Sequence, residues 1–568
     1  MLIGRDGFTE QVTDGRGTTT LAYESGSDRV SSVTDPVTGA VGYTYGISGQ
    51  RLTMTLPGSA TWTYTYQPYT AAMPRDDPNS LGRILEKVTD DQGRICNYYF
   101  DHFGRLHLAR TNQAFNSGGT LTSYQDCRYY FDVNQSGFGH GWTRQVKNTW
   151  NWLNQYGYAQ SSVLVQNDYT YDHAGNRLTN QLSDQNGVIR TEQYGYDALS
   201  RLTSVNYGDG QTQGYTFDPM GNRLTKTDSA NGNDTYTYNN ANMLLSRNGG
   251  SYTNDLNGNT LTGGGRSNTW DGQNRLTQVV YNGTTTTHTY GADGLRRRTV
   301  QGANTTDYLL DDQSVVRTKL NGNVDKTYLH GARGPEYERT GTNSPGWYVY
   351  DGLGSVLGIT DSSGTFTSMR KYDVYGVVRS FTGSNGSKHK FVGQLGHPSE
   401  DETGLIYMRA RYYDPVTGGF ASEDPARHGT NWFTYATPNP ITYYDRTGKE
   451  SIPSITTGMN GAVSIEGTTI PGLAELSVSG VRVGDAVIWE VHTIRAASTG
   501  RIGFRTMFTV IRAWARGQGI QQINIGGIAG SAEGEALMVK LAGFIEAMGG
   551  TAAIAQSNGP IGWVYWLL

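Results

Sequence analysis

A short repeated unit constrains the fold of this 568-residue chain more than any other feature. The unit reads aromatic-x-aromatic-Asp-x-x-Gly-x-Arg-Leu-Thr, and the aspartates of three successive copies, Asp172, Asp197 and Asp218, are 25 and 21 residues apart. That spacing is long enough for two short strands and two turns, and a fixed period of this size is typical of repeat architectures. Clear copies occupy residues 169–179, 194–203, 215–225 and 268–277, and weaker copies occupy residues 43–53 and 98–106.

Each copy predicts a β-hairpin. The aromatic-Thr-aromatic run alternates with the period of a strand, and such residues suit a half-buried pleated surface. The aspartate can accept hydrogen bonds from the amides that follow it, and the glycine tolerates a positive φ, so Asp-x-x-Gly predicts a turn. Hairpins in series form a long antiparallel sheet, which must curl or close to protect its edges. We therefore assign the tyrosines and aspartates of residues 23–329 a structural role rather than carbohydrate binding.

Composition supports a repeat protein. The chain has 76 glycines and 38 tyrosines but only 17% charged residues, unlike a helical enzyme or a disordered chain. The formal net charge of −4 argues against nucleic-acid binding by the repeat body, because phosphate contacts need a basic face. No run approaches the ~18 apolar residues of a membrane span, and the N-terminus lacks the apolar core of a signal peptide. We therefore expect no membrane span and no ordinary signal peptide. Because the chain begins inside repeat-like sequence, we expect it to be the C-terminal portion of a longer polypeptide.

The cysteines and the common catalytic motifs add little. Cys96 and Cys127 each precede a repeat aspartate by five residues, in CNYYFD and CRYYFD. We expect them in equivalent positions of neighbouring repeats, close together and as reduced, buried thiols. The sequence contains no HExxH, no GxxxxGK[ST] and no paired CxxC, so we expect no metal site.

Residues 404–425, GLIYMRARYYDPVTGGFASEDP, and residues 439–449, NPITYYDRTGK, carry a family resemblance. Together they resemble the core-domain signature of the Rhs/YD-repeat polymorphic toxins, which include the C component of ABC-type toxin complexes. The resemblance implies a mainly β fold in which an antiparallel YD-repeat sheet curls into a hollow shell, or cocoon, closed by the Rhs core domain. It also implies three domains: a YD-repeat shell at 1–346, a core and self-cleavage domain at 347–449 and a variable C-terminal effector at 450–568.

Two carboxylates near the boundary at residue 449 are candidates for catalysis. Asp424 and Asp445 are 21 residues apart, and the turn and strand residues between them would allow the two to meet across a hairpin. A close pair of carboxylates can hydrolyse a peptide bond, because one accepts a proton from water while the other donates one. The sequence alone leaves open a second interpretation, in which both are turn residues.

The family resemblance favours the catalytic interpretation. It assigns aspartyl-type self-cleavage to Asp424 and Asp445, with Arg411 orienting one carboxylate, and it places the cut between Lys449 and Glu450. The chain departs from the family's DPxGL ending, because Arg446 replaces the proline and Lys449 replaces the leucine. Self-cleavage requires no cofactor.

Residues 450–568 differ in composition and predict a small α+β or α/β domain. Strands are expected at 486–494, 520–528 and 562–568, and amphipathic helices at 503–516 and 534–550. The glycine-bearing loop before the first helix resembles that of the general-control-related N-acetyltransferases, in which loop amides at a helix N-terminus bind the pyrophosphate of acetyl-coenzyme A. Gly500, Arg501 and Gly503 would be those residues.

Other interpretations of this segment remain open. Glu533 and Glu535 match the ExE motif of ADP-ribosyltransferase toxins, which use NAD. An effector of another chemistry and an inert tail are further alternatives. His492, alone in a predicted strand, is expected to be a packed histidine rather than a base.

The function expected from the resemblance is that of a toxin in which the β-shell encapsulates an effector released by autoproteolysis. Its own C-terminal domain would be the enclosed cargo, and a secretion-system or toxin-complex protein and an immunity protein would be its partners. We expect secretion or delivery by a specialised system and a role in interbacterial competition. The opposing interpretation is a structural or adhesive surface protein with an uncut chain.

Overall fold

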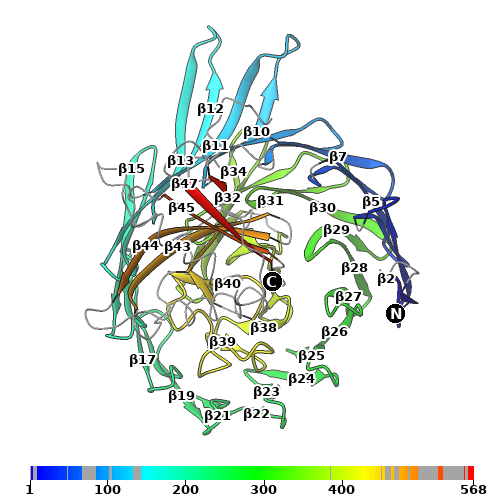
Figure 1. Ribbon diagram of the computed structural model, residues 1–568. Helices are drawn as coiled ribbons and strands as arrows, with labels where there is room; N and C mark the ends of the chain where they lie inside the picture. The colour runs from blue at the N-terminus through cyan, green and yellow to red at the C-terminus, as the bar shows by residue number, and fades with distance from the viewer. Residues whose placement is uncertain are drawn as a thin grey trace. The chain divides into compact units, whose positions relative to one another are not determined.

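The computed structural model describes residues 2–3, 9–27, 29–47, 49–66, 85–100, 105–131, 142–383 and 386–449, together with strands between residues 451 and 567 (Figure 1). The chain forms two compact units. The first comprises Met1–Tyr66, Leu85–Tyr99 and Leu106–Ile455, and the second comprises Gln67–Ile84, Phe100–Arg105 and Thr456–Leu568. The domain boundaries predicted at 346/347 and 449/450 stay predictions.

The first unit contains a 21-stranded antiparallel sheet in which each strand pairs with the next along the chain. Its strands are β1 (Leu2–Ile3), β2 (Thr9–Asp14), β3 (Gly17–Tyr23), β4 (Val30–Asp35), β5 (Gly39–Tyr45), β6 (Arg51–Leu56), β7 (Ala60–Tyr66), β8 (Leu85–Thr89), β9 (Ile95–Phe100), β10 (Leu106–Phe115), β11 (Leu121–Phe131), β12 (Thr143–Leu153), β13 (Ala159–Tyr171), β14 (Arg177–Asp184), β15 (Gly187–Tyr196), β16 (Leu202–Asn206), β17 (Thr212–Phe217), β18 (Arg223–Asp228), β19 (Asp234–Tyr238), β20 (Leu244–Arg247) and β21 (Gly250–Ser251).

A second antiparallel sheet of 14 strands follows in the same manner. Its strands are β22 (Thr253–Asn254), β23 (Thr260–Gly263), β24 (Arg266–Trp270), β25 (Leu276–Tyr281), β26 (Thr284–Tyr290), β27 (Arg296–Gln301), β28 (Asn304–Asp311), β29 (Ser314–Leu320), β30 (Asn323–Gly331), β31 (Gly334–Thr340), β32 (Gly346–Tyr350), β33 (Val356–Thr360), β34 (Phe366–Tyr372) and β35 (Val378–Gly383). The strands of both sheets follow a curved path in Figure 1, and the first unit is the predicted antiparallel β-shell.

The remainder of the first unit contains short elements. A 3-10 helix, η2 (Gly393–Leu395), is the only helix in the described part of the chain. A four-stranded sheet and a two-stranded sheet follow it. They consist of β36 (Ser399–Glu400), β37 (Leu405–Met408), β38 (Arg411–Asp414) and β39 (Gly419–Phe420), and of β40 (Tyr443–Asp445) and β41 (Ser451–Pro453).

The second unit contains a six-stranded sheet in the order β42-β43-β44-β45-β47-β46. Its strands are β42 (Ala462–Ile465), β43 (Leu473–Val483), β44 (Ala486–Ala496), β45 (Gln522–Ile528), β46 (Ala555–Gln556) and β47 (Ile561–Leu567). The pairing of β44 with β45 is parallel and the other pairings are antiparallel. The three predicted strands are confirmed as β44, β45 and β47, whereas the two predicted helices lie outside the described residues.

The repeat turns form as predicted. Asp172 Oδ1 accepts hydrogen bonds from the amides of Ala174 and Asn176 at 2.9 and 2.8 Å, and Gly175 has a φ of +83°. On the strand before the turn, Tyr169 is buried, whereas the hydroxyl of Tyr171 donates to a backbone carbonyl of β12 at 2.7 Å. Because the first tyrosine of the unit packs inward and the second satisfies the backbone, both have structural roles.

The four-stranded sheet packs on the repeat strands. Leu405 and Tyr412 share a buried cluster with Leu276 and Tyr290 of the second sheet. Ile441 packs in the same way on Tyr194 and its neighbours in the first sheet. These contacts hold β38 and the segment that leads to β40 against the inside of the curve drawn by the repeats (Figure 1).

The cysteines are buried, free thiols, as predicted. Cys96 lies on β9 and Cys127 on β11, so one strand separates them. Burial raises the pKa of both thiols above the usual value. They are therefore protonated, packed side chains.

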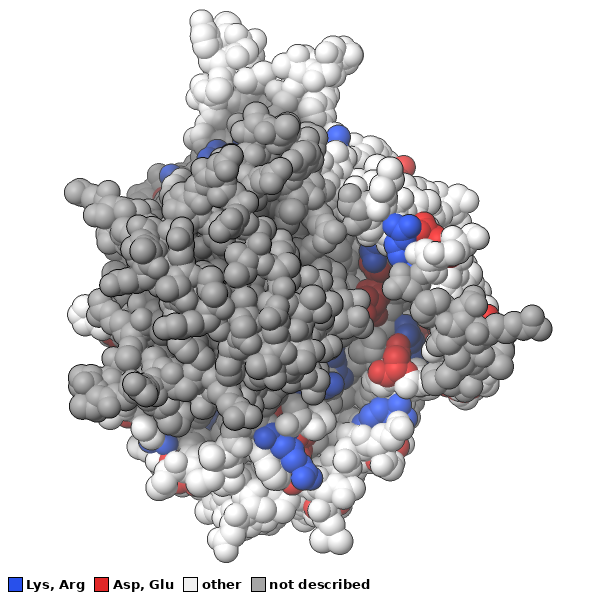
Figure 2. Space-filling view, viewed as in Figure 1, with Lys and Arg blue, Asp and Glu red and all other residues white. Residues whose placement is uncertain are grey.

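Charge on the first unit is mixed rather than segregated. Basic and acidic side chains lie side by side in the described part of the face in Figure 2, without a patch of one sign. Within the part of the chain that the structure describes, we find no helix with the length and hydropathy needed to cross a bilayer.

Candidate functional site

Arg411, the first residue of β38, is the centre of the candidate site. The side chain is 4% exposed and lies over the ring of Phe420, 3.5 Å from the ring centroid. Its Nη1 donates to the carbonyl of Trp432 at 2.9 Å, and its Nε donates to the carbonyl of Gly448 at 2.5 Å. Burial lowers the pKa of Arg411, and the nearby carboxylates oppose that shift. The remaining nitrogen, Nη2, faces both predicted aspartates.

Asp445 ends β40 and organises the turn that follows. Its Oδ2 accepts a hydrogen bond from Arg411 Nη2 at 3.0 Å. Its Oδ1 accepts from three successive backbone amides, those of Thr447, Gly448 and Lys449, at 3.1, 2.7 and 3.1 Å. With the side chain 1% exposed, Asp445 joins the buried guanidinium to the turn that contains Lys449.

Asp424 approaches the same guanidinium from another loop. Its Oδ1 lies 4.0 Å from Arg411 Nη2, and the side chain is 4% exposed. The same oxygen accepts from the amide of Ala426 at 2.9 Å, and Oδ2 accepts from the amide of His428 at 3.0 Å. The structure therefore brings the three predicted residues together, because both carboxylates lie within 4.0 Å of one nitrogen of Arg411.

Both aspartates are also turn residues, as the alternative interpretation expects. Each accepts backbone amides two to four residues ahead, as Asp172 does in the repeats. A turn role and a catalytic role are compatible, since a carboxylate has about four lone-pair sites.

Lys449 lies in the connection between two paired strands. β40 pairs with β41 antiparallel, with Asp445 opposite Ser451. Lys449 is the last described residue before β41, and Glu450 lies outside the described residues. The amide of Lys449 is bound by Asp445, and its carbonyl oxygen lies 3.0 Å from Nδ1 of His428.

A second set of residues fixes the start of this turn. Arg409 Nη1 donates to the carbonyl oxygen of Arg446, and His397 Nε2 lies 3.0 Å from the same oxygen. Arg409 is half-buried, and desolvation together with the nearby charge of Arg446 lowers its pKa to about 10. Burial also lowers the pKa of His397 well below its usual value. The Arg446 carbonyl is thus bound from the side of β37.

Gly448 is the position at which this turn requires glycine. Its φ is +75°, and a Cβ built there would lie 2.2 Å from the carbonyl oxygen of Met408 and 3.0 Å from the amide nitrogen of Arg411. Both neighbours are backbone atoms, which cannot move aside. Gly448 therefore allows the turn to approach β38 closely enough for Arg411 to bind it.

Sequence reasoning missed three residues of this site: His397, Arg409 and His428. The first two contact Arg446 across more than 35 residues of chain, and no local pattern indicates them. His428 follows Asp424 by four residues, so its proximity to Asp424, though not its contact with Lys449, could have been inferred from the turn.

The predicted effector residues cannot be placed in a site. Gly500, Arg501, Gly503, Glu533 and Glu535 lie outside the described residues. His492 lies in β44, the strand predicted for it.

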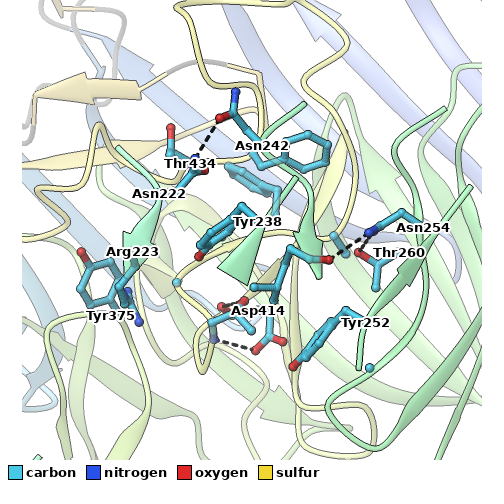
Figure 3. A pocket seen from close by; sticks show the side chains of 18 of the residues that line it. Asn222, Arg223, Tyr238, Asn242, Tyr252, Asn254, Thr260, Tyr375, Asp414 and Thr434 are labelled. Atoms are coloured by element: carbon cyan, nitrogen blue, oxygen red, sulfur yellow. Dashed lines mark hydrogen bonds between the residues drawn. The ribbon is translucent and has the colours of Figure 1, made fainter. Parts of the chain in front are cut away.

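The first unit also contains a cavity of about 70 Å³, between the end of the first sheet, the start of the second and the core-domain segment (Figure 3). Its lining includes Arg223, Tyr252, Tyr375 and Asp414, with several asparagines. A cavity of this size holds a few water molecules. Among the described residues, no group of three or more acidic, histidine or cysteine side chains is arranged to hold a metal ion.

Comparison with known protein families shows which family the chain belongs to. The Teneurin YD-shell family matches residues 116–452, which is more than half of the sequence. The chain belongs to the Teneurin YD-shell family. The match contains most of the repeats, Arg411, both aspartates and Lys449, so the candidate site lies within the family's region.

Curated relatives include several proteins named as toxins or nucleases. The tRNA3(Ser)-specific nuclease WapA of Bacillus spizizenii is 31% identical over 268 residues, which are 44% of this chain and 12% of that protein. The double-stranded DNA deaminase toxin A of Burkholderia cenocepacia is 26% identical over 49% of this chain and 17% of its own length. Toxin subunit YenC1 of Yersinia entomophaga is 32% identical over 30% of this chain and 18% of its own length. The chain spans less than a fifth of each of these relatives.

Solved structures also match part of this chain. The crystal structure of TcdB2-TccC3-Cdc42 matches 78% of this chain and 27% of its own chain, with 17% identity and a TM-score of 0.49. A Photorhabdus luminescens Tc holotoxin pore with the TccC3 substitution D651A matches 80% of this chain and 27% of its own, with 16% identity and a TM-score of 0.47.

Proposed function

We propose that this chain belongs to a YD-shell toxin that cuts itself between Lys449 and Glu450, using Asp424 and Asp445 as an aspartyl pair. The observation that carries the proposal is the contact of Arg411 Nη2 with both carboxylates, at 3.0 and 4.0 Å. One of these carboxylates also binds the amide of Lys449. Hydrogen bonds thus connect the proposed catalytic groups to the backbone of Lys449, the residue before the proposed cut.

The reaction requires the two carboxylates to act in opposite senses. The ionised member accepts a proton from a water molecule, which attacks the carbonyl carbon of Lys449, and the protonated member supplies a proton to the leaving amine. Arg411 holds both side chains in place, and Gly448 allows the peptide to reach them. Because Nη2 is shared, the guanidinium stabilises whichever carboxylate is charged.

Cutting the chain here would not by itself separate the products. β40 and β41 lie on opposite sides of the bond and pair through Asp445–Ser451, Tyr444–Ile452 and Tyr443–Pro453. The new N-terminus would therefore stay paired with the shell, and cleavage must be measured under denaturing conditions.

The test compares rates of cleavage of the full chain made by cell-free translation and analysed on denaturing gels. Asp424→Asn and Asp445→Asn should each slow the appearance of the 450–568 fragment by about 10³-fold or more, and the double variant should be no slower, because residues that act as one unit are non-additive. Lys449→Leu, which restores the family's residue, should be cut at least as fast as the wild type. Cleavage of Asp424→Asn at the wild-type rate would return both aspartates to a turn role alone.

For residues 450–568 we propose an effector enzyme enclosed by the shell and delivered with a toxin-complex partner. Support comes from the relatives, whose names include a tRNA nuclease, a DNA deaminase toxin and a toxin subunit. These names favour a nucleic-acid substrate over the acetyltransferase and ADP-ribosyltransferase chemistries predicted from the sequence. Incubation of the cleaved protein with tRNA and with double-stranded DNA should give degradation or deamination of one of them.

The two cofactor hypotheses are tested on the same protein. Thermal stabilisation by acetyl-coenzyme A would support the acetyltransferase prediction, and stabilisation by NAD would support the ADP-ribosyltransferase prediction, since a ligand that binds only the folded state raises its stability. Stabilisation by either one without any effect on nucleic acid would contradict the nucleic-acid proposal.

A further inference from the structure

His428 is positioned on the carbonyl group that the proposed reaction attacks. Its Nδ1 lies 3.0 Å from the carbonyl oxygen of Lys449. A carbonyl oxygen can only accept a hydrogen bond, so the contact requires a proton on Nδ1. The histidine is therefore a donor to this oxygen.

The backbone around His428 holds the ring in this place. The amide of His428 donates to Asp424 Oδ2 at 3.0 Å, and the amide of Arg427 donates to the carbonyl of Asp424 at 3.0 Å. One aspartate thus orients the loop that carries the histidine, while Asp445 orients the amide of Lys449. The amide and the carbonyl group of Lys449, which belong to successive peptide units, are therefore contacted by Asp445 and by His428.

We propose that His428 is a catalytic residue of the self-cleavage, and that its Nδ1–H stabilises the negative charge that forms on the Lys449 carbonyl oxygen. This inference rests on the proposed self-cleavage and adds a group that aspartyl chemistry does not require. Donors aimed at an oxygen on which charge develops contribute more in the transition state than in the ground state.

The reaction balances with this assignment. Water attacks the carbonyl carbon of Lys449, the π electrons move onto its oxygen, and one carboxylate takes the proton from water. The C–N bond to Glu450 then breaks as the carbonyl forms again, and the leaving nitrogen takes a proton from the other carboxyl group. His428 donates a hydrogen bond to the oxygen throughout and needs no net proton transfer.

A structural contact without catalytic effect is the competing explanation. His428 is exposed, so its replacement leaves no buried cavity and should not alter folding. The chain offers a matched control in His173, another exposed histidine, which directly follows the repeat aspartate Asp172. His173→Ala removes an imidazole from a similar turn that is not at the proposed cleavage site.

The experiment measures the rate of self-cleavage of the full chain in cell-free translation, with thermal unfolding of the products as a check on folding. His428→Ala should slow cleavage by about 10²-fold, the effect of removing one such donor, and His173→Ala should not change it. His428→Asn places an amide N–H close to the position of Nδ1 and should restore the rate to within about tenfold of the wild type.

Two outcomes would overturn the catalytic role of His428, and a third would overturn the proposed self-cleavage on which it rests. Cleavage of His428→Ala at the wild-type rate, while Asp445→Asn is uncut, would make His428 a structural contact and leave the aspartyl pair intact. Equal slowing of His428→Ala and His428→Asn would exclude donation from the Nδ1 position. Cleavage of Asp445→Asn at the wild-type rate would instead remove the proposed function itself.

Discussion

The aspartates of the repeat turns and those of the candidate site use the same local chemistry and differ in their surroundings. Asp218 accepts the amides of Met220 and Asn222 at 2.8 and 2.9 Å, much as Asp445 accepts the amides of Thr447 and Gly448. Asp218 is half-buried and its other oxygen binds the side chain of Asn222 at 2.7 Å. Asp445 is 1% exposed and its other oxygen binds Arg411.

The two regions differ in the sequence position of the arginine that pairs with the aspartate. In the repeats, Asp197 pairs with Arg201 at 2.6 Å, four residues ahead in the same turn. At the site, Arg411 lies 34 residues before Asp445 and also faces Asp424. In the repeats, an aspartate that accepts the amides of its own turn stabilises one hairpin. At the site, an arginine distant in sequence contacts two such aspartates and brings their carboxylates together.

The largest difference between the regions is expected from matched asparagine substitutions. Asp445→Asn should slow the proposed self-cleavage by about 10³-fold or more, because one carboxylate of the proposed aspartyl pair is lost. Asp218→Asn keeps an oxygen for the turn amides and should be cut at the wild-type rate. Densitometry of denaturing gels measures both, and equal rates for the two variants would abolish the distinction between repeat and site aspartates.

A smaller but substantial difference is expected for the arginines. Arg411→Lys loses the fork that binds two carbonyls and two carboxylates, and should slow cleavage and lower the free energy of unfolding by about 2–4 kcal/mol. Arg201→Lys retains a cation beside the partly exposed Asp197 and should change stability by less than about 1 kcal/mol. Chemical denaturation of both variants checks the comparison, and equal destabilisation would contradict a special role for Arg411.

The glycines of the two turns provide a third comparison. Gly448→Ala places a Cβ 2.2 Å from a backbone oxygen, so it should displace the turn, slow cleavage and destabilise the protein by about 3 kcal/mol. At Gly221, which has a φ of +84°, the nearest atom to a built Cβ is 3.6 Å away. Gly221→Ala should cost only about 1 kcal/mol. Thermal unfolding distinguishes them, and a similar loss at both positions would show that φ alone, rather than the close approach to β38, decides the effect.

The smallest expected effect concerns pH. Burial raises the pKa of Asp351, a turn residue before β33, to about 6. A raised folded pKa means that stability is greatest below the unfolded pKa of about 4 and falls as the pH rises through 6. Asp351→Asn should remove this loss and be more stable than the wild type at pH 8 by about 1–2 kcal/mol.

Asp228 should behave in the opposite sense. Burial raises its pKa, but hydrogen bonds from the amide of Ala230 and the side chain of Gln213 outweigh burial and hold the pKa at about 2. Its contribution is present above about pH 4 and is lost as the pH falls through 2. Denaturation of both variants between pH 2 and 8 checks these signs, and a stabilising Asp228→Asn at pH 7 would contradict them.

The sequence predicted the parts of the structure that depend on neighbours in the chain. The aromatic alternation and the Asp-x-x-Gly turns indicated hairpins because both act within about ten residues, and the β-shell followed from their repetition. Residue spacing alone left open whether Asp424 and Asp445 meet. Their association depends on Arg411, whose role came from family resemblance. The contacts of His397 and Arg409 with Arg446, and of His428 with Lys449, depend on how distant loops pack, which no local pattern encodes.

Denaturing intact-mass measurement of the purified wild-type chain tests the central claim most directly. Self-cleavage at this bond predicts two species, one ending at Lys449 and one beginning at Glu450, and a single full-length species for Asp445→Asn. A full-length wild-type chain, or fragments produced by a cut at another bond, would contradict the assignment of Arg411, Asp424 and Asp445 as a self-cleavage site.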